Sequence, residues 1–132
     1  MISVTAIWTI RKGKESEAIS ALKILASKVE ALEPDTLLYI PQSINTKGYS
    51  NPTPNPNDIL FVEMYKDQAA FDFHLYGPNG EKDPSGSFVD FVNEYGHLFE
   101  WDDTTNMPKM IVTALSAFTG FVREGMTFHC KP

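Results

Sequence analysis

Apolar and polar residues alternate at the beginning of the chain. The apolar positions are Ile2, Val4, Ala6, Trp8 and Ile10. A period of two predicts a half-buried β-strand. From residue 18 the apolar positions recur in steps of four and three, which predicts an amphipathic helix. They are Ala18, Leu22, Leu25, Val29 and Leu32. Pro34 is expected to end this helix.

The pattern returns to strand over 36–44 and then breaks. Pro52, Pro54 and Pro56 stand at every second position of an Asn-rich stretch. Prolines at this spacing are incompatible with a helix or an interior strand, so we expect a long surface loop over 45–58. Loops of this length act as lids or dimer arms, or are simply tolerated, and the pattern leaves these alternatives open.

Residues 59–65 predict a strand that runs directly into a short helix. Asp67 offers a side-chain oxygen to the free backbone N–H groups of the first helical turn. Ala70, Phe71, His74 and Leu75 share one face of that helix, because they are spaced by one, three and one residues. The imidazole of His74 is therefore expected to point towards the interior.

A third helix is predicted after the polar, glycine-rich stretch 77–86. Its apolar positions are Phe88, Phe91, Val92, Tyr95, Leu98 and Phe99. A loop is expected over 102–108. Residues 110–122 include apolar residues at both odd and even positions, so both faces of a strand here would be apolar. This is typical of a central strand, or of one that a partner subunit also covers. The tail predicts a short edge strand through Met126, Phe128 and Cys130.

This order of elements predicts an α+β fold of the ferredoxin-like type, a split βαβ unit with an antiparallel sheet. We expect one domain over 1–132, with the long loop 45–58 and a C-terminal extension 123–132. The helices of such a fold cover one face of the sheet only. The other face needs cover, and a second copy of the chain is its simplest source, so we expect a homodimer through the sheet.

Composition and charge exclude several classes of partner. The chain has 132 residues, 11 Lys and Arg against 17 Asp and Glu, and a net charge of −6. It has no basic run, so nucleic acid is not an expected partner. No secretory signal precedes the first strand, and no apolar tract is long enough to cross a bilayer, so we expect no membrane association and a cytoplasmic protein. The single Cys130 excludes an internal disulfide.

No metal or cofactor site is expected from the motifs. His129 and Cys130 are adjacent, and adjacent residues of a strand point to opposite faces, which disfavours a shared ion. There is no glycine-rich phosphate loop and no Ser-His-Asp order.

The stretch 61–74, FVEMYKDQAAFDFH, resembles the central motif of the antibiotic biosynthesis monooxygenase domain family. The stretches 8–15, WTIRKGKE, and 33–39, EPDTLLY, resemble two further motifs of that family, in the expected order. The resemblance implies a dimeric α+β barrel that pairs through its sheets, with a pocket between the sheet and the helices of each subunit. The activities it implies are cofactor-independent oxygenation of aromatic or quinol compounds, haem degradation, and isomerisation of a small phosphorylated signal.

The haem-degrading branch matches poorly. That branch combines an asparagine on the first strand, a tryptophan near the third strand and a histidine on a later helix. Here the first strand has no asparagine and residues 59–66 contain no tryptophan, although His97 is placed late in the third predicted helix.

His74 is the candidate catalytic base, because a neutral imidazole in an apolar cavity can accept a phenolic proton. The alternative is a core histidine that is hydrogen-bonded to a backbone carbonyl. The candidate substrate-binding residues, most of them equally suited to plain packing, are Trp8, Tyr39, Tyr65, Phe71, Asn93 and Trp101. Glu63 is expected to pair with a Lys or Arg on a neighbouring strand.

The sequence therefore predicts a cofactor-independent monooxygenase that acts on a small aromatic, phenolic or quinol-like compound. Two alternatives stay open. One is a non-catalytic small-molecule binder or accessory protein on the same fold, which would have a filled cavity or one with no polar group beside His74. The other is an isomerase of a small sugar-like metabolite, which would need several polar or basic groups in the cavity.

Overall fold

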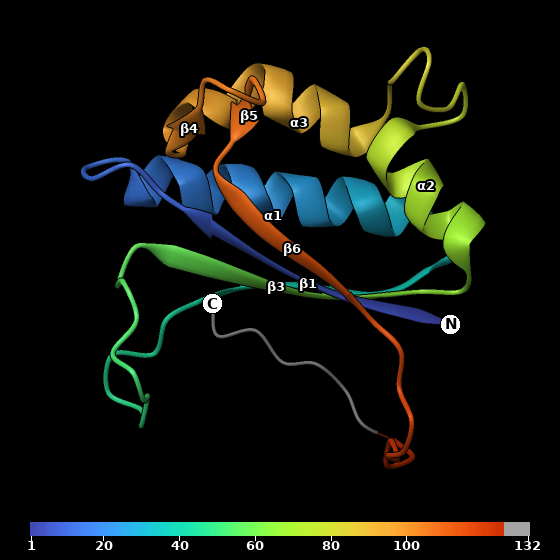
Figure 1. Ribbon diagram of the computed structural model, residues 1–132, viewed down its shortest axis with the longest axis horizontal. Helices are drawn as coiled ribbons and strands as arrows, with labels where there is room; N and C mark the ends of the chain where they lie inside the picture. Colours follow the sequence, from blue (N-terminus) through green and yellow to red (C-terminus); the bar gives the residue numbers. More distant parts are fainter. Residues whose placement is uncertain (126–132) are drawn as a thin grey trace.

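The computed structural model describes residues 1–125, which form a four-stranded antiparallel sheet with three α-helices on one of its faces (Figure 1). The strands of this sheet follow the spatial order β2-β3-β1-β6. Their bounds are β1 Ile2–Thr9, β2 Thr36–Ser43, β3 Asp58–Tyr65 and β6 Met110–Leu115. The helices are α1 Glu15–Leu32, α2 Gln68–Tyr76 and α3 Ser87–Tyr95. The predicted α+β, ferredoxin-like fold is confirmed.

The strand register places one set of alternating side chains under the helices. Val4 lies opposite Glu63, Ala6 opposite Phe61, and Trp8 opposite Ile59. Ala6, Trp8, Ile59 and Phe61 form the main core with the apolar face of α1, as the period-two and period-3.6 patterns predict. Val4 belongs to a second, smaller cluster. Leu32 is the exception, because it is the last residue of α1 and is 61% exposed.

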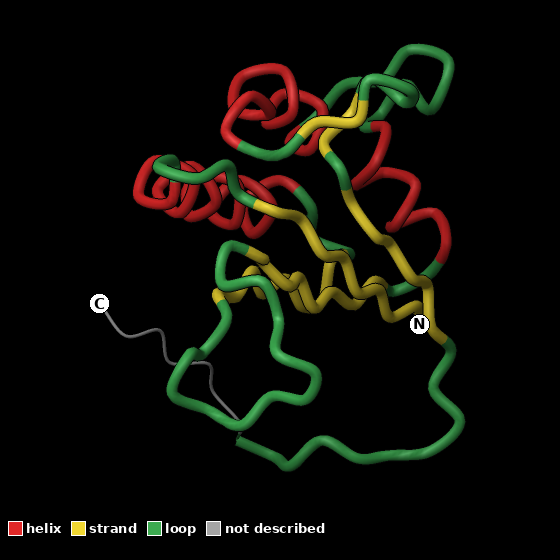
Figure 2. The backbone as a smooth tube through the Cα atoms, turned by 60° about the vertical axis from the view of Figure 1, so that its left-hand side comes forward, coloured by secondary structure: helices red, strands yellow, loops and turns green. Residues whose placement is uncertain are grey.

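No helix within residues 1–125 covers the opposite face of the sheet. The loop 44–57 and the segment 116–125 both extend away from the sheet on this side (Figure 2). The proline-rich loop is thus at the surface, as predicted.

Helix α2 begins and ends where its sequence requires. The carboxylate of Asp67 accepts a hydrogen bond from the backbone N–H of Ala70 at 2.9 Å, which caps the first turn. Gly77 ends the helix at φ 73°, and a Cβ atom there would lie 2.5 Å from the carbonyl oxygen of Ser85. These two ends fix the rotation of the helix, and His74 is buried as predicted.

The third helix is shorter than predicted. It ends at Tyr95 and is followed by a single 3-10 turn, η1 Gly96–Leu98, so that Phe99 lies beyond it and pairs its backbone with Ile10. The predicted loop 102–108 contains a minimal hairpin, β4 Trp101–Asp102 with β5 Met107–Pro108.

The strand predicted over 110–122 is shorter than expected, and its predicted central position in the sheet is wrong. The alternative, that a partner subunit covers this strand, stays a prediction. Strand β6 lies at the edge of the sheet, and it ends where Leu115 pairs with Ser3. Beyond that point β1 has almost no residues left to pair with, which is why the strand stops. The predicted strand through Met126, Phe128 and Cys130 lies outside the described residues. Among residues 1–125, no helix has the length and apolar character needed to cross a membrane.

Candidate active site

A cavity of about 420 Å³ lies between the inner face of the sheet and helices α2 and α3. Its wall is largely apolar and aromatic, and includes Trp8, Phe61, Phe71, Phe88 and Met110. His74 contributes the imidazole and Glu63 the carboxylate of this wall. A flat, mostly apolar ligand is the kind that such a surface accommodates.

The imidazole of His74 is paired with the carboxylate of Glu33. Nδ1 of His74 lies 2.8 Å from Oε2 of Glu33, and both side chains are only 3% exposed. Oε2 also accepts a hydrogen bond from the hydroxyl of Thr36 at 3.1 Å. Glu33 immediately follows α1, and its backbone N–H caps that helix by donating to the carbonyl of Val29. The end of α1 therefore fixes the carboxylate.

This pairing determines which nitrogen of the ring is available. A carboxylate that accepts from Nδ1–H stabilises the tautomer in which Nε2 carries the lone pair. Within residues 1–125, every buried polar side-chain atom has a hydrogen-bonding partner. Nε2 makes no hydrogen bond to these residues, so it must be exposed to open space. The open space that His74 lines is the cavity. The basic nitrogen therefore faces the place that a ligand would occupy.

Three aromatic rings hold the imidazole in place. The ring centroids of Tyr39, Tyr65 and Phe88 lie 5.3, 5.5 and 5.7 Å from that of His74. Such packing restricts the rotamer of the histidine and keeps bulk water away from it.

A second buried carboxylate, Glu63, lies beside the histidine. Its Oε2 accepts a hydrogen bond from the hydroxyl of Tyr65 at 2.7 Å. Burial raises the pKa of Glu63 above its ordinary value, against the opposing effect of His74. Burial and the nearby carboxylates raise the pKa values of Tyr39 and Tyr65, so both phenols stay protonated. The expected pairing of Glu63 with a Lys or Arg is wrong, because its partner is the phenol two residues along the same strand.

The structure brings together some of the predicted site residues and separates others. Trp8, Tyr39 and Phe71 line the cavity together with His74. Tyr65 is fully buried, donates its hydrogen bond to Glu63 and does not line the cavity.

Asn93 and Trp101 do not line the cavity either. Asn93 is exposed on α3, and Trp101 packs against Gly96, where a Cβ atom would come within 2.9 Å of the indole. His97 is exposed on η1, away from His74.

The most important residue that the sequence did not single out is Glu33. The Glu-Pro pair at the end of α1 is visible in the sequence, but a glutamate before a proline is ordinarily a solvated helix end. Only the folded chain brings it beside a histidine 41 positions later. The expected backbone-carbonyl partner for a core histidine is replaced by this carboxylate.

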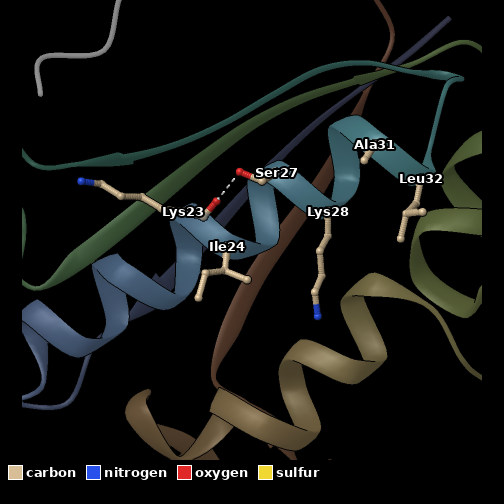
Figure 3. A pocket seen from close by; sticks show the side chains of 6 residues that line it. All are labelled: Lys23, Ile24, Ser27, Lys28, Ala31 and Leu32. Carbon is tan, nitrogen blue, oxygen red and sulfur yellow. Dashed lines mark hydrogen bonds between the residues drawn. The ribbon is translucent and has the colours of Figure 1, made fainter.

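Other hollows at the surface offer less chemistry. One of them is an open groove along the outer side of α1, and Figure 3 shows its lining side chains: Lys23, Ile24, Ser27, Lys28, Ala31 and Leu32. The hydroxyl of Ser27 is turned back onto the carbonyl of Lys23 at 3.1 Å, so it does not face a ligand (Figure 3). Among residues 1–125, no cluster of three His, Cys, Asp or Glu side chains has the geometry to hold a metal ion.

The sequence of the first sixty per cent of the chain identifies its relatives. Residues 1–79 match the family model described as antibiotic biosynthesis monooxygenase. The chain belongs to this family. The match covers β1 to α2, and so includes Glu33, Glu63 and His74. No curated protein matches the chain.

Solved structures of other members of the fold resemble the chain over most of its length. A Deinococcus radiodurans protein provisionally named an antibiotic biosynthesis monooxygenase is 17% identical, with a TM-score of 0.63 over 95% of this chain and 100% of its own. A Caulobacter crescentus protein with the same provisional name is 20% identical, with a TM-score of 0.65 over 89% and 90%. A Mycobacterium tuberculosis protein is 15% identical, with a TM-score of 0.61 over 90% and 96%. At these identities the likeness establishes the fold.

Proposed function

We propose that this member of the antibiotic biosynthesis monooxygenase family is a cofactor-independent monooxygenase that acts on a small aromatic, phenolic or quinol-like compound, with His74 as the base. The observation that carries the proposal is the pairing of His74 with Glu33 at the wall of an aromatic cavity of about 420 Å³. The carboxylate partner orients the imidazole and holds its proton on Nδ1, which leaves Nε2 as the nitrogen that can take a proton from a ligand.

The chemistry starts with proton removal. Nε2 of His74 takes a proton from a carbon or hydroxyl of the substrate, and the electron-rich anion that results is a reductant for dioxygen. Electrons pass from the anion to dioxygen, and a bond forms between the ring carbon and one oxygen to give a peroxide. The O–O bond then breaks as the same carbon loses its remaining hydrogen as a proton. The products are a carbonyl and water, so substrate and dioxygen give an oxidised product that contains one of the two oxygen atoms.

The polar groups of the cavity suit this role. Imidazolium at His74 offsets the negative charge that develops on the substrate, in surroundings where water does not screen it. Glu63, with its raised pKa, can accept a hydrogen bond when ionised or donate one to a substrate oxygen when protonated. Trp8 and Phe88 are positioned to contact the faces or edges of a planar ring.

The same proposal includes a homodimer formed through the sheet. Ile7 and Ile111 are cross-strand neighbours on the face that no helix of the described part of the chain covers, and they are 36% and 66% exposed. A second copy of this face would remove them from water. The cytoplasmic location expected from the sequence stays a prediction.

The two alternative functions are less well supported by the geometry. A binder without catalysis would have a filled cavity or one with no polar group beside His74, whereas this cavity is open and contains Glu63. An isomerase of a sugar-like compound would need several basic or polar groups, and no Lys or Arg of the described residues lines this cavity.

Dioxygen consumption tests the proposal. The protein is mixed with a panel of hydroquinones, naphthols and anthrone-type compounds preselected by thermal shift, because a true ligand raises the melting temperature. We expect oxygen uptake with at least one of them, and one isotopically labelled oxygen atom in the product when labelled dioxygen is supplied. Binding without oxygen uptake would support the non-catalytic alternative instead.

A further inference from the structure

The pair of Glu33 and His74 separates two hollows of the protein. His74 lines the inner cavity and Glu33 does not. Glu33 lines a second depression, of about 300 Å³, which His74 does not line. The walls of this depression come from the passage between α1 and β2, with Glu33, Asp35 and Thr36, and from the start of α2, with Asp67 and Phe73. The hydrogen-bonded pair is thus the partition between them.

The two oxygens of Glu33 have different surroundings. Oε2 receives both hydrogen bonds, from Thr36 at 3.1 Å and from Nδ1 of His74 at 2.8 Å. Oε1 takes part in neither bond, and no buried polar side-chain atom within residues 1–125 lacks a partner. Oε1 therefore contacts solvent, and the depression is the hollow that Glu33 lines. One carboxylate touches the histidine with one oxygen and water with the other.

The geometry points to Glu33 as the proton conduit between the buried histidine and bulk water. This inference rests on the proposed function, because it assigns the route by which the proton that His74 takes from a substrate reaches solvent. Glu33 does not line the cavity, so it is a positioning and proton-carrying residue and not one that touches the substrate.

The transfer balances in three steps. A proton arrives at Nε2 from the substrate, and the ring becomes an imidazolium. The proton on Nδ1 moves along the 2.8 Å hydrogen bond to Oε2 of Glu33, which leaves a neutral ring protonated at Nε2 and a neutral carboxyl. The carboxyl group then turns about its Cγ–Cδ bond, so that the protonated oxygen faces the depression, and this oxygen releases the proton to water and leaves a carboxylate. The reverse sequence returns a proton to the cavity, where the departing hydroxide needs one to become water.

The charges around the pair favour this direction. The other titratable groups that line the cavity are Glu63, Tyr39 and Tyr76, and none of them carries a positive charge. Tyr65 donates a hydrogen bond to Glu63 from outside the cavity wall. On the depression side are Asp35, whose carboxylate lies 3.3 Å from Nζ of Lys66 at the surface, and Asp67, which caps α2. Both aspartates line the depression together with Glu33. The negative charge of Asp67 attracts a proton that leaves Glu33, whereas Lys66 offsets the charge of Asp35.

Exchange of the Nδ1 proton of His74 with solvent tests the conduit without any substrate. Nitrogen-15 NMR of the full-length protein measures this rate in the wild type and in Glu33→Gln, which keeps an acceptor oxygen but cannot carry a proton. We expect the exchange in Glu33→Gln to be slower by at least ~10-fold, as for loss of a proton-transfer group. Glu30→Gln, an exposed site on the same helix, is the matched control and should exchange at the wild-type rate.

An unchanged exchange rate in Glu33→Gln would overturn the conduit. It would also be overturned if Glu63→Gln, and not Glu33→Gln, slowed the exchange of the Nδ1 proton. Should Glu33→Gln fail to fold, Glu33→Asp takes its place. Its side chain is one methylene shorter, so its carboxyl group lies farther from Nδ1. Exchange at the wild-type rate in that variant would also overturn the conduit. These outcomes are independent of oxygenation. A protein that consumes no dioxygen but shows slowed exchange in Glu33→Gln would lose the proposed function and keep the conduit.

Discussion

Nδ1 of His74 lies 2.8 Å from Oε2 of Glu33, in a pair of side chains that are each 3% exposed. The two residues are 41 positions apart, because Glu33 directly follows α1 and His74 lies in the last turn of α2. Their contact therefore ties two helices together and also sets the tautomer of the imidazole. Removal of either partner should therefore lower both the free energy of unfolding and the catalytic rate.

Truncation of Glu33 should destabilise the fold. Glu33→Ala leaves Nδ1 of His74 and the hydroxyl of Thr36 without their acceptor. A buried polar group without a partner costs about 1–3 kcal/mol, so we expect the free energy of unfolding in urea to fall by about that amount. Glu30→Ala, on the exposed side of the same helix, should change it by less than ~0.5 kcal/mol. Equal losses in the two variants would mean that the pair does not stabilise the fold.

The stability of the protein should depend on pH through Glu63. Burial raises its folded-state pKa above 4.5, the ordinary value, so the folded protein holds this proton more tightly than the unfolded chain. The contribution is present in full below about pH 4.5 and is lost as the pH rises through the folded-state value. Glu63→Gln carries no such charge, so it should gain stability relative to the wild type over this rise in urea titrations at a series of pH values. A relative gain by the wild type would show that the fold stabilises the ionised carboxylate.

Filling the cavity should block ligand binding without unfolding the protein. Ala6 lines the cavity and is 5% exposed, so a methionine there extends into open space. We expect Ala6→Met to abolish the thermal shift given by ligands, with a change in stability of less than ~1.5 kcal/mol. Ala114→Met is the control. Ala114 lies on β6 on the same face of the sheet as Val112, the cross-strand neighbour of Ala6, but it is exposed and does not line the cavity. Retained binding in Ala6→Met would place the ligand elsewhere.

Charge on the uncovered face of the sheet should dissociate the proposed dimer. Ile7→Lys places an ammonium group beside Ile111, and a charge buried between two sheets without a partner is strongly unfavourable. Light scattering should report a dimer for the wild type and a monomer for this variant. Ile24→Lys, at an exposed site on the outer side of α1, should stay a dimer. A monomeric wild type would contradict the proposed homodimer.

The sequence predicts those parts of the fold that follow from local periodicity. Val4, Ala6 and Trp8 are buried together because they alternate along β1, and α1 buries Ala18, Leu22 and Leu25 on one face. His74 is buried because Asp67 and Gly77 fix both ends of a short helix. Each of these results depends on residues within a few positions of one another.

The parts that the sequence did not predict depend on distant pairings. Strand β6 stops at Leu115 because β1 offers no further partner, although the apolar run continues to Val122. Trp101 lies away from the cavity because the indole fits against Gly96. Glu33 looks like a solvated helix end until α2 is folded against it. The cavity wall was therefore predicted in part, and the partner of the histidine was not.

The role of His74 as the base is tested by a comparison of oxygen uptake by the wild type and by His74→Gln. Gln has a similar polar side chain but cannot act as a base at Nε2. With a substrate that the wild type oxidises, we expect kcat to fall at least ~10²-fold in His74→Gln, while the thermal shift given by the same ligand is retained. Wild-type oxygen uptake by His74→Gln, in a folded protein that binds the ligand, would contradict the assignment of His74 as the base.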